Sequence, residues 1–295
     1  MNQDNSKNGR EGTFCLRVAC PDQKGLIAAV TQAIAAEGGN ILDLAQHTAT
    51  DIDTFMLRAV FERGEKFDEA RFRADFGENY AKRFQMEWSL FDLSRRQRMA
   101  IFVSRTDHCL FELLLQHRDG ELECDVPCII SNHEDLRYVA EQFGIPFYVW
   151  SIAPDKSNRA QVEREEMELL RRKRISFIVL ARYMQVISDE MIAEYPHHII
   201  NIHHSFLPAF VGAKPYHQAY ERGVKIIGAT SHYVTRELDA GPIIEQDVVR
   251  ISHKDTPDSL VLKGRDLEKI VLSRAVSKHI ERKILTYKNR TIVFG

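Results

Sequence analysis

Four short apolar runs separated by amphipathic segments constrain the fold of this chain more than any other feature. The runs are MAIFVS (99–104), VPCIISN (126–132), PFYVWS (146–151) and SFIVLAR (176–182). Near-continuous apolar runs of this length are typical of strands buried on both faces of a parallel sheet. Helices are expected between them at Asp107–His117, Glu134–Phe143 and Asn158–Lys173. The pattern predicts an α/β fold, an open, mostly parallel doubly wound sheet with its ligand crevice at the carboxyl ends of the strands.

The N-terminal part of the chain follows a different order. Strands are expected at Thr13–Cys20, Ile41–Thr48, Thr54–Phe61 and Phe84–Phe91, with helices at Lys24–Glu37 and Phe67–Lys82. This order is that of a ferredoxin-like βαββαβ unit. The predicted organisation is a mobile tail (1–12), this unit (13–93), a short polar linker (94–98) and the doubly wound domain (99–295). We expect that last domain to end in a helix over Thr256–Ile284 and a short strand in TIVFG.

Charge and composition exclude several classes of protein. The 40 basic and 42 acidic residues nearly cancel, so a nucleic-acid partner is not expected, and the basic run RRQR in the linker is better explained by solvent exposure. No apolar run approaches the roughly 20 residues that span a bilayer, and the first residues lack a hydrophobic signal region, so we expect a cytoplasmic protein without a membrane partner. Five cysteines without a CxxC pair indicate reduced thiols. Cys124 and Cys128 could ligate a metal, but their apolar neighbours favour packing.

The stretch from Ile199 to Gln246 carries the residues best suited to chemistry. Asn201, His203 and His204 end an apolar run, and Asp239 lies in the turn DAGP further on. An amide, an imidazole and a carboxylate can together polarise a carbonyl, move a proton and stabilise developing charge, as acyl transfer requires. Each residue alone could equally serve a turn or a strand end. A metal site is not expected, because HExxH spacing is absent and adjacent strand residues should face opposite sides.

Three segments, VLARYMQVIS, INIHHSFLP and TRELDAGPIIEQ, resemble the folate-dependent formyltransferase family. The resemblance implies that Asn201 donates to the formyl oxygen and that His203 donates a hydrogen bond or passes a proton. It also implies that Asp239 orients the imidazole, stays ionised and could act as general base. Folate binding would then fall to Met184, Gln185, Val186 and Ile187, which offer backbone hydrogen bonds to the pterin, together with Arg236 and Glu237.

The segments CPDQKGLIAAVT and GGNILDLAQH resemble an ACT domain. Such domains pair edge to edge and bind small effectors at a glycine-bearing turn, which implies a homo-oligomer and an amino-acid effector such as glycine or methionine. The effector candidates on this resemblance are Asp22, Gly25, Leu26, Asn40 and Ile41. The alternative is that the glycines only permit tight turns and that the unit serves assembly.

The turn after the first strand of the second domain departs from the pattern of the transferases. It reads VSRTDHCLFELL, without the glycines that cradle a phosphate, although Ser104, Arg105 and Thr106 could still meet an anion. Loss of a phosphate-bearing acceptor leaves water as nucleophile. His204, where several transferases carry proline or alanine, could position that water or only pack.

The resemblance therefore implies a hydrolase that converts 10-formyltetrahydrofolate to formate and tetrahydrofolate, with no metal and no permanently bound cofactor. Such an enzyme would supply formate and balance one-carbon pools for purine synthesis. The alternatives are a formyltransferase to an amine or to tRNA, and a catalytically silent regulatory protein that binds folate or amino acids.

Overall fold

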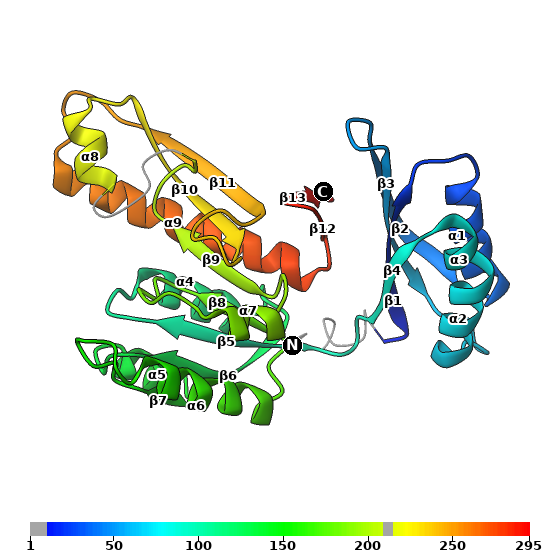
Figure 1. The fold of residues 1–295 in the computed structure, drawn as a ribbon, viewed down its shortest axis with the longest axis horizontal. Coiled ribbons are helices and arrows are strands. Elements are labelled where there is room, and N and C mark those ends of the chain that lie inside the picture. Colours follow the sequence, from blue (N-terminus) through cyan, green and yellow to red (C-terminus); the bar gives the residue numbers. More distant parts are fainter. Residues whose placement is uncertain (1–10, 209–214) are drawn as a thin grey trace, which may run out of the picture. The chain divides into compact units, whose positions relative to one another are not determined.

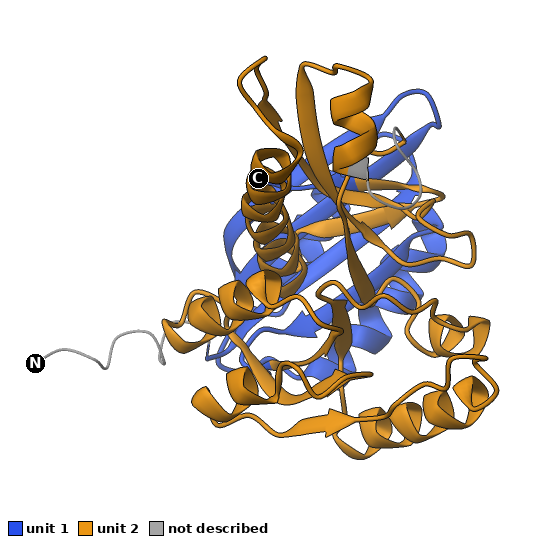
Figure 2. Cartoon of the chain, turned by 90° about the vertical axis from the view of Figure 1, so that its left-hand side faces the viewer, with its two compact units in different colours: residues 1–96, 292–295 blue, residues 97–291 orange. Residues whose placement is uncertain are grey.

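The structure is a computed structural model that describes residues 11–208 and 215–295. The chain divides into two compact units, Met1–Arg96 with Ile292–Gly295 and Gln97–Thr291, which Figure 2 shows in different colours. The mobile tail expected at residues 1–12 lies, up to residue 10, outside the described residues. Among the helices of the described part, none combines the length and apolar composition that a membrane crossing requires.

The first unit is the expected ferredoxin-like fold. Its elements are β1 (Thr13–Pro21), α1 (Leu26–Ala36), β2 (Asn40–Ala49), β3 (Thr54–Glu62), α2 (Glu69–Asp75), the π-helix η1 (Phe76–Ala81), α3 (Lys82–Phe84) and β4 (Glu87–Asp92). The strands pair antiparallel in the order β2-β3-β1-β4. Figure 1 shows α1, α2 and α3 on one face of this sheet.

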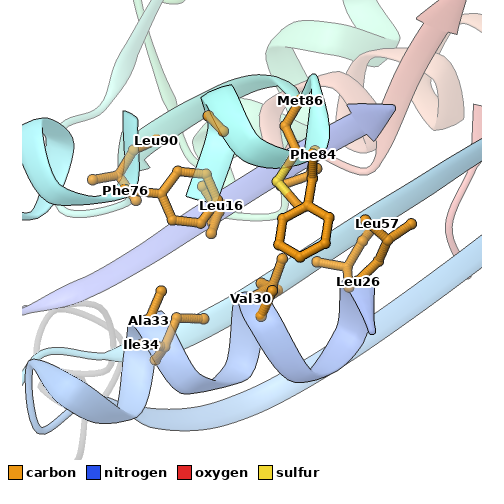
Figure 3. Close-up of a cluster of buried hydrophobic side chains, with 14 of the residues drawn as sticks. Leu16, Leu26, Val30, Ala33, Ile34, Leu57, Phe76, Phe84, Met86 and Leu90 are labelled. Carbon is orange, nitrogen blue, oxygen red and sulfur yellow. The ribbon is translucent and has the colours of Figure 1, made fainter. Parts of the chain in front are cut away.

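The core of the first unit lies between that sheet and its helices. Leu16 and Leu57 of the sheet, Val30 and Ile34 of α1, and Phe76 of η1 are each fully buried there (Figure 3). Burying side chains of this size stabilises a fold by roughly 1.5–3 kcal/mol each. Because α1 and the segment from α2 to α3 both contribute, the unit has an apolar core of its own.

The rest of the chain builds the predicted doubly wound sheet. Its elements are β5 (Gln97–Val103), α4 (His108–Arg118), β6 (Cys124–Ser131), α5 (Arg137–Gln142), β7 (Phe147–Val149), α6 (Arg159–Arg172), β8 (Phe177–Leu180), α7 (Asp189–Glu194), β9 (Ile199–His203), α8 (Pro215–Glu221), β10 (Ile226–Tyr233), β11 (Ile243–Arg250), α9 (Pro257–Ile280), β12 (Ile284–Tyr287) and β13 (Arg290–Val293). Seven strands follow the order β11-β10-β9-β8-β5-β6-β7, and β12 pairs with β13. The strands from β9 to β7 are parallel, whereas β10 pairs antiparallel with both β9 and β11.

The strand order reverses between β5 and β8, which lie side by side although β6 and β7 separate them in sequence. Ligands of open α/β sheets bind at such a switch point, outside the carboxyl ends of the strands. One face of the sheet is covered by α6 and α7, whose Met167, Leu170 and Met191 pack on Phe102 and Ile130. The long helix α9 packs against α4 and against β9, β10 and β11. The fold class predicted from the sequence is thus confirmed for both units.

Two predicted boundaries are wrong, and both fall where a residue other than glycine ends a helix. The last helix stops at Ile280, because Arg282 adopts a left-handed φ of 58° and the amides of Arg282 and Lys283 bond back to His279 and Lys278. These two bonds form a Schellman cap. Likewise Phe84, expected to begin a strand, ends α3, because Gln85 is left-handed with a φ of 53°.

Candidate active site

A cavity of about 610 Å³ lies at the carboxyl ends of β5, β8 and β9. Asn201, His203 and His204 line it from β9 and the residue beyond, and Asp239 lines it from the turn between β10 and β11. The described structure therefore brings together the four residues that the sequence singled out for chemistry. They meet because β9 ends at the switch point and β10 returns antiparallel beside it.

His203 is held by Asp239. Its Nδ1 lies 3.3 Å from Asp239 Oδ2, and the ring is only 6% exposed. The hydrogen bond from His203 keeps the pKa of Asp239 well below its usual range, so this carboxylate stays ionised. Since Nδ1–H donates to the carboxylate, Nε2 of the neutral ring carries a lone pair. This atom is buried and has no hydrogen-bond partner among the described residues.

Asn201 is oriented by a histidine that the sequence analysis missed. His232 on β10 is the cross-strand partner of Asn201, and its Nε2 lies 3.2 Å from Asn201 Nδ2. The other ring nitrogen, Nδ1, lies 3.0 Å from the carbonyl oxygen of Tyr233, which can only accept, so Nδ1 carries the proton. Nε2 then accepts from the Asn201 amide and leaves the second N–H of that amide free to donate. The contact between His232 Nε2 and Asp239 Oδ1 is 3.6 Å, too long to compete.

His204 lies beside His203 and not on the opposite face. The two ring centroids are 5.2 Å apart and both rings line the cavity, so the expectation that they face opposite sides is wrong. The physical reason is that β9 ends at His203, and strand alternation does not extend to the next residue. Nη1 of Arg182 lies 2.7 Å from His204 Nδ1. Burial, reinforced by the Arg182 charge, lowers the pKa of His204 to about 4.

The buried carboxylate of Glu268, also missed by the sequence analysis, lies beside Arg182. Glu268 of α9 is 1% exposed, and its Oε2 lies 2.7 Å from His108 Nε2 and 3.5 Å from Arg182 Nε. Its Oε1 accepts from the Tyr216 hydroxyl at 2.8 Å. Burial opposes ionisation of Glu268, but the His108 hydrogen bond and the Arg182 charge outweigh it and lower the pKa. The carboxylate therefore balances the arginine.

Within the described part of the chain, the donors spaced closely enough to hold a metal ion are His108, Cys109 and Glu268. The set suits a divalent cation poorly. Burial raises the pKa of the Cys109 thiol well above its usual value, so this thiol is neutral in the metal-free protein. The nearby Arg182 guanidinium would also repel a cation. Cys124 and Cys128 are both fully buried.

The segment Met184–Ile187 forms one rim of the cavity. Met184 and Val186 expose 63% and 65% of their surface, whereas Ile187 is buried. Two backbone groups are already used inside the protein, because Met184 N donates to Ser104 Oγ at 3.0 Å and Val186 O accepts from Arg159 at 3.1 Å. These two bonds hold the segment in place. Val186 and Gln185 themselves line the cavity.

The other expected binding residues divide into two groups. Arg236 and Thr106 line the cavity, but Glu237 and Arg105 are exposed and do not belong to the lining that the described residues form. Ser104 is buried and bonds Asn132 Oδ1 at 2.7 Å.

The effector candidates lie in the first unit. Gly25 caps α1 with a left-handed φ of 93°, which a side chain would strain, so its place in the turn is explained by conformation. Asp22 and Asn40 are exposed and Ile41 is half-buried. Leu26 is only 2% exposed and belongs to the apolar core.

Residues 97–276 match the family described as formyl transferase, and residues 16–70 match the ACT domain. A formyltetrahydrofolate deformylase of Synechocystis is 47% identical over 96% of this chain and 99% of that protein. A formyltetrahydrofolate deformylase of Bacillus subtilis is 45% identical over 99% of this chain and 97% of that protein. A crystal structure of a formyltetrahydrofolate deformylase from Pseudomonas syringae superposes with a TM-score of 0.91 at 45% identity, covering 96% of this chain and 94% of that one. A glycinamide ribonucleotide transformylase from Symbiobacterium toebii superposes with a TM-score of 0.64 at 28% identity and covers 68% of this chain and 95% of its own.

Proposed function

This chain belongs to the formyltetrahydrofolate deformylase family, and we propose that Asn201, His203 and Asp239 are the groups with which it hydrolyses 10-formyltetrahydrofolate. Water oxygen forms a bond to the formyl carbon, and the bond between that carbon and N10 of the folate breaks. One proton of the water goes to N10, and the formic acid released ionises to formate. The products are formate, a proton and tetrahydrofolate.

His203 passes the proton. The single observation that carries this role is the buried Nε2 of His203, which has no partner among the described residues, while Asp239 fixes the proton on Nδ1. Nε2 accepts a proton from the attacking water and later delivers it to N10 of the folate. Asp239, which stays ionised, stabilises the imidazolium that exists between these two steps.

Asn201 stabilises the negative charge on the formyl oxygen. The amide N–H that His232 does not use donates to this oxygen as the carbonyl becomes tetrahedral. One such donor is worth about 3–4 kcal/mol in the transition state of acyl transfer. Because Asn201 and His232 are cross-strand partners, the donor is oriented before the substrate arrives.

The folate binds along Met184–Ile187. The pterin needs hydrogen-bond donors and acceptors beside apolar walls, and the backbone and the Gln185 side chain supply them next to exposed Met184 and Val186. Arg236, exposed at the cavity rim, suits the carboxylates at the other end of a folate. No further cofactor takes part in this proposal, and the reaction serves cytoplasmic one-carbon metabolism.

The first unit binds an amino-acid effector and joins subunits. Its ACT match and the exposure of Asp22, directly after β1, and of Asn40, at the start of β2, support this part of the proposal. Glycine and methionine are the effectors to test first, by calorimetry and by their effect on rate. Mass measurement in solution tests the homo-oligomer.

The activity is tested with purified protein and 10-formyltetrahydrofolate without any amine acceptor. Formate is measured through formate dehydrogenase and NADH, and tetrahydrofolate through its absorbance. Equal amounts of both products are expected. If the folate binds by calorimetry but no formate forms until an amine is added, the protein transfers the formyl group and the hydrolase proposal fails.

A further inference from the structure

Arg182 makes a contact with His204 that decides the protonation of the ring. The guanidinium can only donate hydrogen bonds, and its Nη1 lies 2.7 Å from His204 Nδ1. Nδ1 must therefore be the unprotonated nitrogen that accepts. A neutral imidazole carries its single proton on the other nitrogen, so His204 presents Nε2–H. Among the described residues, no protein acceptor for that N–H is seen, and His204 lines the cavity.

The position of Arg182 is set by buried groups from several elements. Glu268 of α9 lies 3.5 Å from Arg182 Nε and is itself held by His108 and Tyr216. Tyr216 can approach because Gly264 has no side chain, since a Cβ there would lie 2.1 Å from the Tyr216 ring. Arg182 therefore contacts Glu268 through Nε and His204 through Nη1.

The backbone of Arg182 is a second, independent sign of this constraint. Its φ is 64°, a left-handed conformation that is unfavourable for a side chain other than glycine. Strain of this kind costs on the order of 1–3 kcal/mol and persists where the surroundings hold the residue. Arg182 is thus positioned directly after β8, at the switch point, in a conformation suited to its contacts.

We propose that Arg182, braced by Glu268, is a positioning residue that fixes His204 as a hydrogen-bond donor to the water that attacks the formyl carbon. The inference rests on the proposed hydrolase function. The Nε2–H of His204 donates a hydrogen bond to one lone pair of the water oxygen and leaves the other lone pair to attack the formyl carbon. Because Nδ1 is engaged and Nε2 is already protonated, His204 cannot take the proton of the water. That proton goes to His203, whose Nε2 is free.

The groups facing His204 keep this arrangement over a wide pH range. These groups are Arg182, Glu268 of α9, Tyr216 of α8, and the catalytic pair His203 and Asp239. Burial and the arginine outweigh the two carboxylates, so His204 stays neutral above about pH 5, given its pKa of about 4. Without Arg182, one of the charges that oppose protonation is lost, and the pKa of His204 should rise.

The protonation of His204 is tested first by nitrogen NMR of the full-length protein labelled in its histidines. The His204 signals are assigned by their loss in His204→Gln. At pH 7 we expect Nδ1 to be unprotonated and Nε2 to be protonated. Protonation on Nδ1, or on both nitrogens, overturns the inference whether or not the protein is active. Absence of formate release by the wild type would instead overturn the proposed function.

The role in the reaction is tested by a double-mutant cycle of Arg182→Met and His204→Gln, measured on kcat. Each single variant should lose about 10- to 100-fold, the usual cost of misplacing a reacting group. If Arg182 acts through His204, Arg182→Met should change kcat less than about threefold in the His204→Gln background. Equal losses in both backgrounds overturn the inference.

Two further measurements separate positioning from a structural effect. In Arg182→Met the acidic limb of the profile of kcat against pH should move to higher pH than in the wild type, because the positive charge that opposes protonation of His204 is removed. The matched control is Arg274→Met, also on an arginine paired with an acidic residue but outside the cavity, which should leave kcat unchanged. If Arg182→Met does not fold, the variant that combines Arg182→Met with Glu268→Gln, and so removes both charges together, takes its place in the cycle with His204→Gln.

Discussion

Replacing Asp239 by asparagine removes one negative charge and hardly changes the size of the side chain. Its Oδ2 lies 3.3 Å from His203 Nδ1. Two unit charges at that distance attract by about 5 kcal/mol at an effective dielectric constant of 20. The Asp239 side chain is 14% exposed, so solvent screening lowers this to about 3–4 kcal/mol.

That attraction is present only while His203 carries the proton of the water. Its loss therefore raises the barrier and leaves the affinity for folate nearly unchanged. At about 1.4 kcal/mol per factor of ten, kcat should fall about 10²- to 10³-fold, with KM within about threefold. The assay is formate release at saturating 10-formyltetrahydrofolate.

The matched control is Asp247→Asn, which removes a carboxylate on β11 that pairs with Arg274 outside the cavity. It should retain the wild-type kcat. A kcat for Asp239→Asn above one tenth of the wild-type value would show that no charged imidazolium is stabilised here, and it would refute the role given to the pair.

Three further perturbations test other parts of the structure. Asn201→Ala should lower kcat about 10²- to 10³-fold, measured by formate release, because it removes the donor to the formyl oxygen. Burial raises the pKa of Glu166 to about 7, so the folded protein binds its proton between pH 4.5 and 7 when the unfolded chain does not. Wild-type stability therefore falls as pH rises through this window. From pH 5 to pH 8, the difference in free energy of unfolding between Glu166→Gln and the wild type, measured by urea unfolding, should shift by about 2–3 kcal/mol in favour of the variant. Gly264→Ala should cost about 1–3 kcal/mol of thermal stability, because its Cβ would overlap Tyr216.

Each of these three has its own contrary result. Full activity of Asn201→Ala would show that another group holds the formyl oxygen. A stability difference for Glu166→Gln that is the same at both pH values would show that the carboxyl titrates normally. Gly77→Ala is the control for Gly264→Ala, since a Cβ there meets Trp88 at an ordinary 3.8 Å. Equal effects of the two glycine substitutions would refute the packing argument.

Local sequence patterns were enough to predict the elements of the first unit and, in the second, the strands from MAIFVS to SFIVLAR with the helices between them. Apolar runs such as SFIVLAR indicated buried strands of a parallel sheet, whose crossovers are right-handed as a general rule. The antiparallel strands β10 and β11 and their place in the strand order were not predicted. The helix ends at Ile280 and Phe84 were not predictable in this way, because Arg282 and Gln85 adopt conformations that usually indicate glycine or asparagine. Only the surrounding structure selects such a conformation.

The same limit applies to the site. Asn201, His203 and Asp239 carry a recognisable order along the chain, and the structure brings them together. His232 was missed because a histidine on an alternating strand looks like any half-buried residue until β9 is placed beside β10. Glu268 was missed because a single glutamate in a charged helix gives no sign of burial, which here arises from contacts with elements far away in sequence.

The groups that we propose for catalysis are divided between two kinds of structure. Asn201, His203 and the orienting residue His232 belong to the paired strands β9 and β10, whereas Asp239 belongs to a connection that follows β10. Segments without ladder hydrogen bonds open at lower free energy than paired strands do. The enzyme can therefore lose its carboxylate, and with it turnover, in a local opening that leaves the sheet intact. On warming, activity should disappear reversibly before the circular dichroism of the sheet changes, and the amide protons near Asp239 should exchange with solvent long before that of Asn201.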